Sequence, residues 1–193
     1  MTFKKLLLCV TTLVLATQIQ FAHAANPRVK VETSKGTMVF ELYPDKAPKT
    51  VENFLAYVRA GTYDGTIFHR VIKNFMNQGG GFTTDYKKVA TRDPIQNEAD
   101  NGLKNLKYTI AMARTGAPHS ATNQFFINTA NNAFLDHTAK TSRGWGYTVF
   151  GKVVEGENIA GAISRVATGP GGPFAKDAPR TPIIINKITE IKE

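Results

Sequence analysis

Short runs of alternating apolar and polar residues recur along this chain, and residues typical of turns separate them. Val29, Val31 and Thr33 alternate with charged residues, and residues 37–43 alternate again after the turn Ser34-Lys35-Gly36. This pattern is typical of a β-hairpin. Further strands are predicted within residues 68–81, which hold two short runs, and at 95–98, 108–114, 124–129, 147–154 and 181–191.

Two segments have the spacing of an amphipathic helix instead. Pro48 suits a first helical turn, and Gly61 suits a C-terminal cap. Between them, four apolar residues follow at helical spacing: Val51, Phe54, Leu55 and Val58. The second predicted helix covers residues 157–166 and places Ile159, Ile163 and Val166 on one side. Each helix therefore has one apolar face that can pack on a sheet.

About eight short strands and two helices, mostly in meander order, favour a closed β structure, because closure removes exposed strand edges. We predict a mainly β fold, a closed eight-stranded antiparallel barrel capped by two α-helices. The segment 82–105 is polar and reads as a long loop, and 168–180 is rich in glycine and proline, with a tight surface loop expected at 169–173. No internal repeat or domain linker is visible.

The first 24 residues have the pattern of a secretory signal peptide. Lys4 and Lys5 give a positive start, Leu6–Ala16 is an apolar core, and Ala22-His23-Ala24 is a small-x-small cleavage site. The eleven residues of the core are too few to span a bilayer. We therefore expect residues 1–24 to be cleaved and residues 25–193 to form a single domain without a membrane anchor.

Cleavage would leave 169 residues and lower the net charge from +9 to +7, because the removed piece carries two lysines and no acid. The only cysteine, Cys9, is lost with it, so a disulfide, a thiol nucleophile and a thiolate metal site are all excluded. The basic residues are dispersed, with Lys87-Lys88 as the densest pair. A solvated surface explains this charge better than a nucleic-acid partner. No feature indicates a subunit interface, and a monomer is expected.

The sequence contains no motif typical of a serine hydrolase or of a metal site. His119 and Ser120 are adjacent, but no Gly-x-Ser-x-Gly elbow exists for a serine nucleophile. The three histidines of the mature chain have no metal-ligand spacing, so neither a metal nor another cofactor is expected; they are His69, His119 and His137.

The remaining polar clusters also have ordinary interpretations. Residues 169–173 lack the lysine and hydroxyl residue of a phosphate-binding loop. Asp93, Glu98 and Asp100 are carboxylates in one loop, where a glycosidase pair is conceivable, but hydrogen bonding within the loop is the commoner use.

The segment Phe68–Gly81 combines one arginine with large apolar side chains and ends in three glycines. On a strand, Phe68 and Arg70 share one face. Arg70 could form a surface ion pair while Phe75 and Met76 belong to the core, or it could stand beside an apolar binding surface. Spacing alone leaves both interpretations open.

The motifs of this segment resemble the signature of the cyclophilin-type peptidyl-prolyl cis-trans isomerases. Further segments match that family in the right order, namely Ala111–Arg114, Asn123–Ile127, Phe134–Asp136 and Val149–Val153. Asn97–Leu103 is similar to the exported bacterial branch. The resemblance covers residues 29–191.

The resemblance implies an eight-stranded barrel with two helices and isomerase activity on X–Pro bonds. Arg70 matches the catalytic arginine of the family. The proline pocket is matched by Phe75, Met76, Phe126 and Leu135, and the groups that bind the surrounding peptide are matched by Gln78, Ala113 and Gln124. Our hypothesis is that Arg70 donates a hydrogen bond to the prolyl nitrogen as the bond twists.

Two substrate-binding positions depart from the commonest eukaryotic pattern. Phe134 stands where tryptophan is usual, and Tyr147 where histidine is usual, as in the bacterial branch. Because the tryptophan of the family donates a hydrogen bond to cyclosporin, weak binding of this drug is expected.

The expected partners are proline-containing peptides and unfolded exported proteins. The resemblance implies a periplasmic location, with secretion further out as an alternative. A chaperone-like holder of proline-containing segments is the competing function, and Arg70 favours the enzyme. A nucleic-acid binder is a third possibility, which would show retention on DNA that depends steeply on salt.

Overall fold

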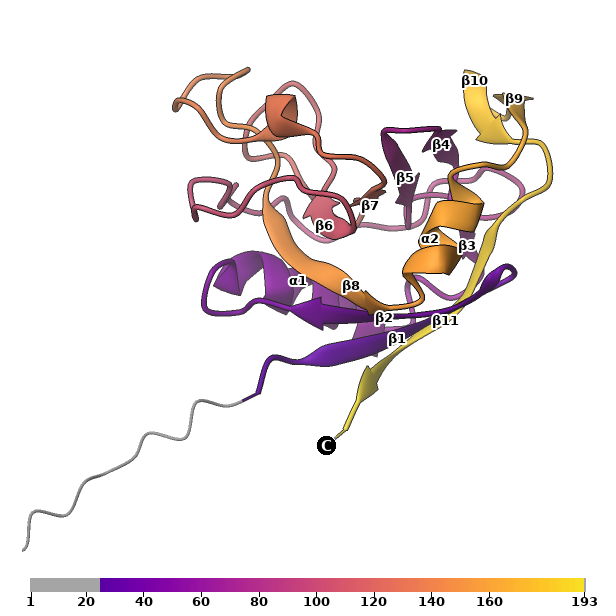
Figure 1. Ribbon diagram of the computed structural model, residues 1–193, viewed down its shortest axis with the longest axis horizontal. Coiled ribbons are helices and arrows are strands. Elements are labelled where there is room, and N and C mark those ends of the chain that lie inside the picture. The colour runs from indigo at the N-terminus through magenta and orange to yellow at the C-terminus, as the bar shows by residue number, and fades with distance from the viewer. Residues whose placement is uncertain (1–24, 193) are drawn as a thin grey trace, which may run out of the picture.

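Nine strands form one antiparallel sheet in the computed structural model, which describes residues 25–192 (Figure 1). The sheet has the order β3-β11-β1-β2-β8-β6-β7-β5-β4, and β9 and β10 pair separately. The strands are β1 (Arg28–Thr33), β2 (Gly36–Leu42), β3 (Thr66–Ile67), β4 (Arg70–Ile72), β5 (Met76–Gly79), β6 (Thr109–Met112), β7 (Phe125–Asn128), β8 (Val149–Glu155), β9 (Thr168–Gly171), β10 (Phe174–Pro179) and β11 (Ile184–Ile191). The helices are α1 (Pro48–Arg59), α2 (Glu157–Ile163) and the short 3₁₀ helix η1 (Ala133–Leu135).

The predicted hairpin is present as β1 and β2. Thr33 pairs with Gly36 across the turn, and the Thr33 hydroxyl donates to the Gly36 carbonyl at 2.7 Å. Gly36 has φ +130°, a conformation that favours glycine. The turn residues and the alternation of the strands therefore both predicted this hairpin correctly.

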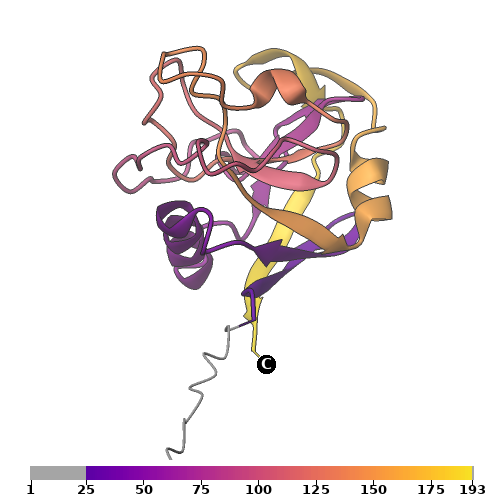
Figure 2. The ribbon, with the colours of Figure 1, turned by 60° about the vertical axis from the view of Figure 1, so that its left-hand side comes forward.

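The sheet curls until its two ends meet. Its order starts at β3 and ends at β4, and only Phe68 and His69 separate these strands in the chain. The Ile67 amide donates to the Phe82 carbonyl at 2.9 Å, and Thr66 bridges Thr83 just beyond β5. The predicted antiparallel barrel-like fold with two helices is thus confirmed, with nine strands in the curled sheet where eight were expected. Figure 2 places α1 and α2 on opposite sides of it.

Aromatic residues fill the interior. Phe54 of α1 lies with its ring centroid 5.2 Å from those of Tyr63 and Phe150 and 5.6 Å from that of Phe125. The four apolar positions predicted for the helix face are all buried, namely Val51, Phe54, Leu55 and Val58. Burying one such side chain contributes about 1.5–3 kcal/mol, so this face accounts for the attachment of α1. Gly61, with φ +65°, follows the helix as expected.

Glu98 caps the start of α1 from a distant part of the chain. Ala47, at the N-cap position, offers no side-chain hydrogen bond. Instead the Glu98 carboxylate accepts bonds from the amides of Lys49 and Thr50, at 3.1 and 2.9 Å, and from the Thr50 hydroxyl at 2.7 Å. A carboxylate is favoured at the positive end of a helix. Glu98 therefore ties the 82–105 loop to α1, and its bonds do not stay within the loop.

Two of the predicted strand and helix ranges need correction. Residues 95–98 form no strand, and only a bridge joins Ile95 to Ala121. The backbone amides of Asn97 and Glu98 donate to side chains instead of a neighbouring strand, at 3.0 Å to Nδ1 of His119 and at 2.9 Å to the Thr148 hydroxyl. The second helix ends at Ile163 where residue 166 was expected. The amides of Arg165 and Val166 bond three residues back, so the last turn is tighter than an α-helix.

The glycine- and proline-rich segment 168–180 also differs from the expected loop, because it forms the hairpin of β9 and β10. Gly172 has φ +49°, which allows the turn between the two strands. Phe174 packs against His69 and Phe82, so an aromatic contact fixes a segment whose composition indicated a loop.

The predicted signal peptide, residues 1–24, lies outside the described residues. Within residues 25–192, no helix is both long and apolar enough to cross a membrane.

Candidate active site

Arg70 stands on the outer face of the curled sheet. It pairs with Gln78 of β5, and Gln78 pairs with Phe126 of β7. Residues directly opposite each other in an antiparallel sheet project to the same face. The next residue, Val71, is buried in the interior with 1% exposure. Strand alternation therefore places Arg70, Gln78 and Phe126 together, facing away from the core.

A second apolar cluster covers this outer face. Its buried members are Met76, Ala111, Phe126, Leu135 and Val149, and partly buried side chains around it include Phe75, Ala113 and Tyr147. Phe126 and Tyr147 meet edge to face with centroids 5.8 Å apart. The cluster is separate from the barrel interior, so this side of the sheet has its own small core.

A cavity of about 110 Å³ opens in this cluster. It is lined by Arg70, Phe75, Met76, Gln78, Ala113, Arg114, Phe126, Leu135 and Tyr147. Eight of these nine residues belong to the predicted site. The structure therefore brings together side chains from β4, β5, the turn between them, β7, η1 and the loops after β6 and η1. Their roles remain predictions.

The other two predicted residues lie beside this cavity. Gln124 lines an adjoining cavity of about 160 Å³, together with Gln78 and Ala113. Phe134 is 74% exposed, and its ring centroid lies 5.5 Å from that of Phe75. Phe134 thus forms part of the rim of the site.

A chain of side-chain hydrogen bonds connects the charged and amide groups. The Nη1 of Arg70 donates to Oε1 of Gln78 at 3.5 Å, and the Nε2 of Gln78 donates to Oε1 of Gln124 at 2.9 Å. The first bond is long and therefore weak. Gln78 is held mainly by Gln124, which leaves the Arg70 guanidinium able to bond a ligand.

Arg114 is a site residue that sequence reasoning did not single out. Its guanidinium lies over the Tyr147 ring, 4.8 Å from the centroid, and its Nε donates to the Gly146 carbonyl at 2.8 Å. Its Nη2 reaches the Ser142 carbonyl at 3.0 Å. Arg114 therefore fixes the loop that carries Tyr147. The motif Ala111–Arg114 contains it, but spacing does not show a contact with a loop about thirty residues away.

His69, which directly precedes β4, is buried, with 1% exposure. Its ring stacks on Phe174 and also contacts Phe82, with centroids 5.2 and 4.7 Å away. Burial lowers the pKa of His69 to about 4, and the neighbouring Arg70 charge acts in the same direction. His69 is therefore neutral at pH 7.

Within residues 25–192, no three His, Cys, Asp or Glu side chains gather to form a metal site.

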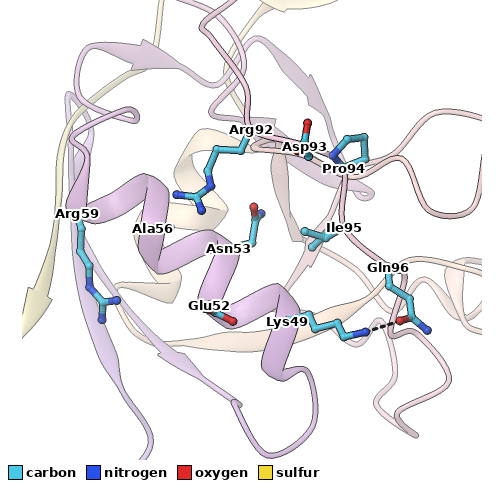
Figure 3. Close-up of a pocket in the computed structure, with 10 residues that line it drawn as sticks. All are labelled: Lys49, Glu52, Asn53, Ala56, Arg59, Arg92, Asp93, Pro94, Ile95 and Gln96. Carbon is cyan, nitrogen blue, oxygen red and sulfur yellow. Dashed lines mark hydrogen bonds between the residues drawn. The ribbon is translucent and has the colours of Figure 1, made fainter.

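A larger cavity of about 520 Å³ lies elsewhere, between α1 and residues 92–96 (Figure 3). Two of its cations are already paired. Lys49 donates to Gln96 at 2.5 Å, and Arg59 forms two bonds to Glu190, at 2.7 and 2.8 Å. Its walls are mainly polar and charged, and it shares no residue with the Arg70 cavity. The smaller cavity is the better candidate because it combines an apolar wall with a cation.

Residues 28–190 match the family model described as "Cyclophilin type peptidyl-prolyl cis-trans isomerase/CLD". The chain belongs to this cyclophilin family. The match covers the whole curled sheet except the last residue of β11, and it includes every residue of the candidate site.

Cyclophilins from several bacteria are similar over most of the chain. The peptidyl-prolyl cis-trans isomerase cyp18 of Streptomyces antibioticus is 61% identical over 157 residues, which are 81% of this chain and 94% of that protein. Isomerase B of Escherichia coli (strain K12) is 52% identical over 83% of this chain and 98% of its own length. Isomerase A of Dickeya dadantii is 50% identical over 98% of this chain and 99% of its own. The chain is accordingly a peptidyl-prolyl cis-trans isomerase.

A solved cyclophilin has the same fold. The crystal structure of a Cryptosporidium parvum cyclophilin type isomerase, in the presence of the dipeptide Ala-Pro, superposes with a TM-score of 0.70 at 26% identity. The superposition covers 86% of this chain and 99% of that one.

The buried neutral state of His69 predicts how stability depends on pH. Between pH 6.5 and 4 the histidine of the unfolded chain takes up a proton while the buried His69 does not. The free energy of unfolding should therefore fall as the pH falls from 7 to 4, with His69 contributing up to about 3 kcal/mol. Denaturant titrations of the wild type and of His69→Gln across this range measure the contribution. Equal pH dependence in the two proteins would contradict it.

Proposed function

We propose that the cavity beside Arg70 is the active site and that it binds the proline of a peptide while the preceding bond rotates. The observation that carries the proposal is a guanidinium at the edge of a small apolar cavity. Cavities for drug-sized ligands measure about 300–1,000 Å³, so about 110 Å³ suits a small ring better than a cofactor. The Cryptosporidium relative crystallised with Ala-Pro supports a prolyl ligand.

The reaction explains why this set of residues is sufficient. Rotation about an X–Pro bond is slow because amide resonance must be broken, with a barrier of about 18–20 kcal/mol. In the twisted transition state the prolyl nitrogen regains its lone pair and can accept a hydrogen bond. Arg70 supplies the donor, and its charge is permanent near neutral pH. No bond is made or cleaved, so the step needs neither a nucleophile nor a general base.

The apolar walls perform a second task. Phe75, Met76, Phe126 and Leu135 hold the proline ring in one place while the residue before it turns. They also exclude water from the region next to Arg70, which strengthens the hydrogen bond formed in the transition state. Gln78, Ala113 and Gln124 line the adjoining cavity, where they contact the peptide on either side of the bond.

Replacement of Arg70 by alanine should remove most of the catalysis. Loss of the transition-state donor is expected to lower kcat/KM about 10²- to 10³-fold, with the fold intact, since Arg70 is 39% exposed. Arg70→Lys should restore little, because an ammonium lacks the planar set of donors. A cis-to-trans peptide assay at substoichiometric enzyme measures the rates.

Arg28→Ala serves as the matched control, because Arg28 is an exposed arginine of β1 paired with Glu41 at 3.2 Å. It should keep the wild-type rate. An Arg70→Ala variant as fast as the wild type would refute the role of Arg70. A wild type that retains peptides without turning over would favour a chaperone-like holder.

The exposed Phe134 should make cyclosporin binding weak. A phenylalanine cannot donate the hydrogen bond that a tryptophan at this rim position would offer. Phe134→Trp is therefore expected to tighten inhibition by up to about tenfold, the equivalent of one hydrogen bond. Inhibition curves with both proteins measure the change. Nanomolar inhibition of the wild type would contradict the expectation.

We also propose that this isomerase acts on newly exported proteins in the periplasm. The support is the signal-like pattern of residues 1–24, and the match to the Dickeya protein, which covers 98% of this chain and so extends into that segment. Uncatalysed prolyl isomerisation takes about 10–100 s at 25 °C, which gives a catalyst a use wherever unfolded chains arrive. Secretion beyond the periplasm is the alternative destination.

The full-length chain produced in a Gram-negative host should be recovered from the periplasmic fraction with Ala25 as its first residue. Ala24→Leu should block cleavage, because the cleavage site requires a small residue there. Mass spectrometry of the fractionated protein measures both. Uncleaved wild-type protein confined to the cytoplasm would overturn the export proposal and leave the assignment of the active site untouched.

A further inference from the structure

The β9–β10 hairpin is packed beside the strand that carries Arg70 (Figure 1). Phe174 at the start of β10 stacks on the ring of His69 at an interplanar angle of 25°, and it meets Phe82 edge to face. A side chain at Gly172 would collide with the Tyr86 ring, so the turn of the hairpin also lies close against its neighbours. Because His69 directly precedes Arg70, these contacts fix the hairpin relative to the guanidinium.

The backbone of β10 departs from regular pairing where it passes Arg70. Phe174 pairs with Gly171 and Ala178 pairs with Gly169, so three residues of β10 stand opposite one residue of β9. Such bulges are frequent next to active sites, where they redirect a side chain. The last of the three residues is Asp177.

Asp177 has φ +68°, the left-handed conformation that most residues avoid at a cost of about 1–2 kcal/mol. Aspartate tolerates it better than most, yet it is one of only four non-glycine residues with positive φ in the described part of the chain. A strained conformation that persists in a folded protein is a reason to look for a function at that position.

The bulge brings the Asp177 carboxylate to Arg70. Oδ2 of Asp177 lies 3.9 Å from Nε of Arg70, while Gln78 accepts from Nη1 of Arg70 at 3.5 Å. The two contacts are both long and involve different nitrogens of the planar guanidinium, and neither of them uses Nη2. The side chains are 39% and 22% exposed, so solvent screening leaves the pair little weight in stability.

We propose that Asp177 is a positioning residue that sets the plane of the Arg70 guanidinium and directs a free N–H at the prolyl nitrogen. This inference rests on the proposed catalytic role of Arg70. A donor that must meet a lone pair only in the transition state gains from being held in place beforehand.

Asp177→Asn tests the proposal, since asparagine has a similar size, tolerates positive φ and carries no charge. We expect kcat to fall about three- to tenfold while KM stays within about twofold, because the contact orients the transition-state donor and does not bind the ground state. Exchange spectroscopy on a cis/trans peptide separates kcat from KM. The ¹⁵N–¹H resonance of Arg70 Nε should shift, which a merely structural change would not require.

Asp177→Gly is a second variant that fits φ +68° and removes the side chain, so it should show the same loss of kcat. Glu32→Gln is the control, because Glu32 is paired with Lys30 at 3.0 Å in β1, away from β4 in the sheet. It should behave as the wild type.

Unchanged kcat in both Asp177 variants, or an unchanged Arg70 Nε resonance, would overturn the positioning role. If Arg70→Ala is inactive while Asp177→Asn is fully active, only this inference fails. Wild-type activity in Arg70→Ala would instead refute the proposed active site.

Discussion

The register of β4, β5, β7 and β6 is the constraint on which the candidate site depends. Across these strands Val71, Asn77, Ile127 and Ile110 stand in one row, and three of the four belong to the apolar interior. The neighbouring row places Arg70, Gln78, Phe126 and Ala111 on the outside. A slip of one residue would exchange the rows. The packing of the interior therefore fixes the geometry of the exterior, although no interior side chain touches the cavity.

Two consecutive residues, His69 and Arg70, differ in charge and in exposure. His69 is buried and neutral, with its pKa lowered to about 4 by burial, whereas Arg70 remains at the surface beside Gln78. In the proposed mechanism the rotation requires only a fixed donor and a rigid apolar wall, and Arg70 and the apolar lining of the cavity supply them. The hairpin that packs on His69 also brings a carboxylate to Arg70, so two consecutive residues contact the same hairpin.

Patterns of neighbouring residues predicted those elements that form by interactions between residues close together in the sequence. Alternation and helical spacing predicted the first hairpin and the buried face of α1, and the family motifs named eight of the nine residues that line the cavity. The features that the sequence did not predict all depend on contacts between residues that are far apart in the chain. Glu98 caps a helix that begins 50 residues earlier, and Arg114 bonds to the loop before Tyr147. Residues 168–180 read as a loop because their aromatic partners lie far away in the chain. Such contacts leave no periodic signal.

The location of the cavity on the outer face has a consequence for the shape of the substrates. A site inside the barrel would admit only a chain end or a small molecule. The candidate site lies instead on the outer face and is continued by the adjoining cavity at Gln78 and Gln124. If the site binds prolyl peptides as proposed, a polypeptide lies across it and extends in both directions, so a proline in the middle of a long chain is as accessible as one near a terminus.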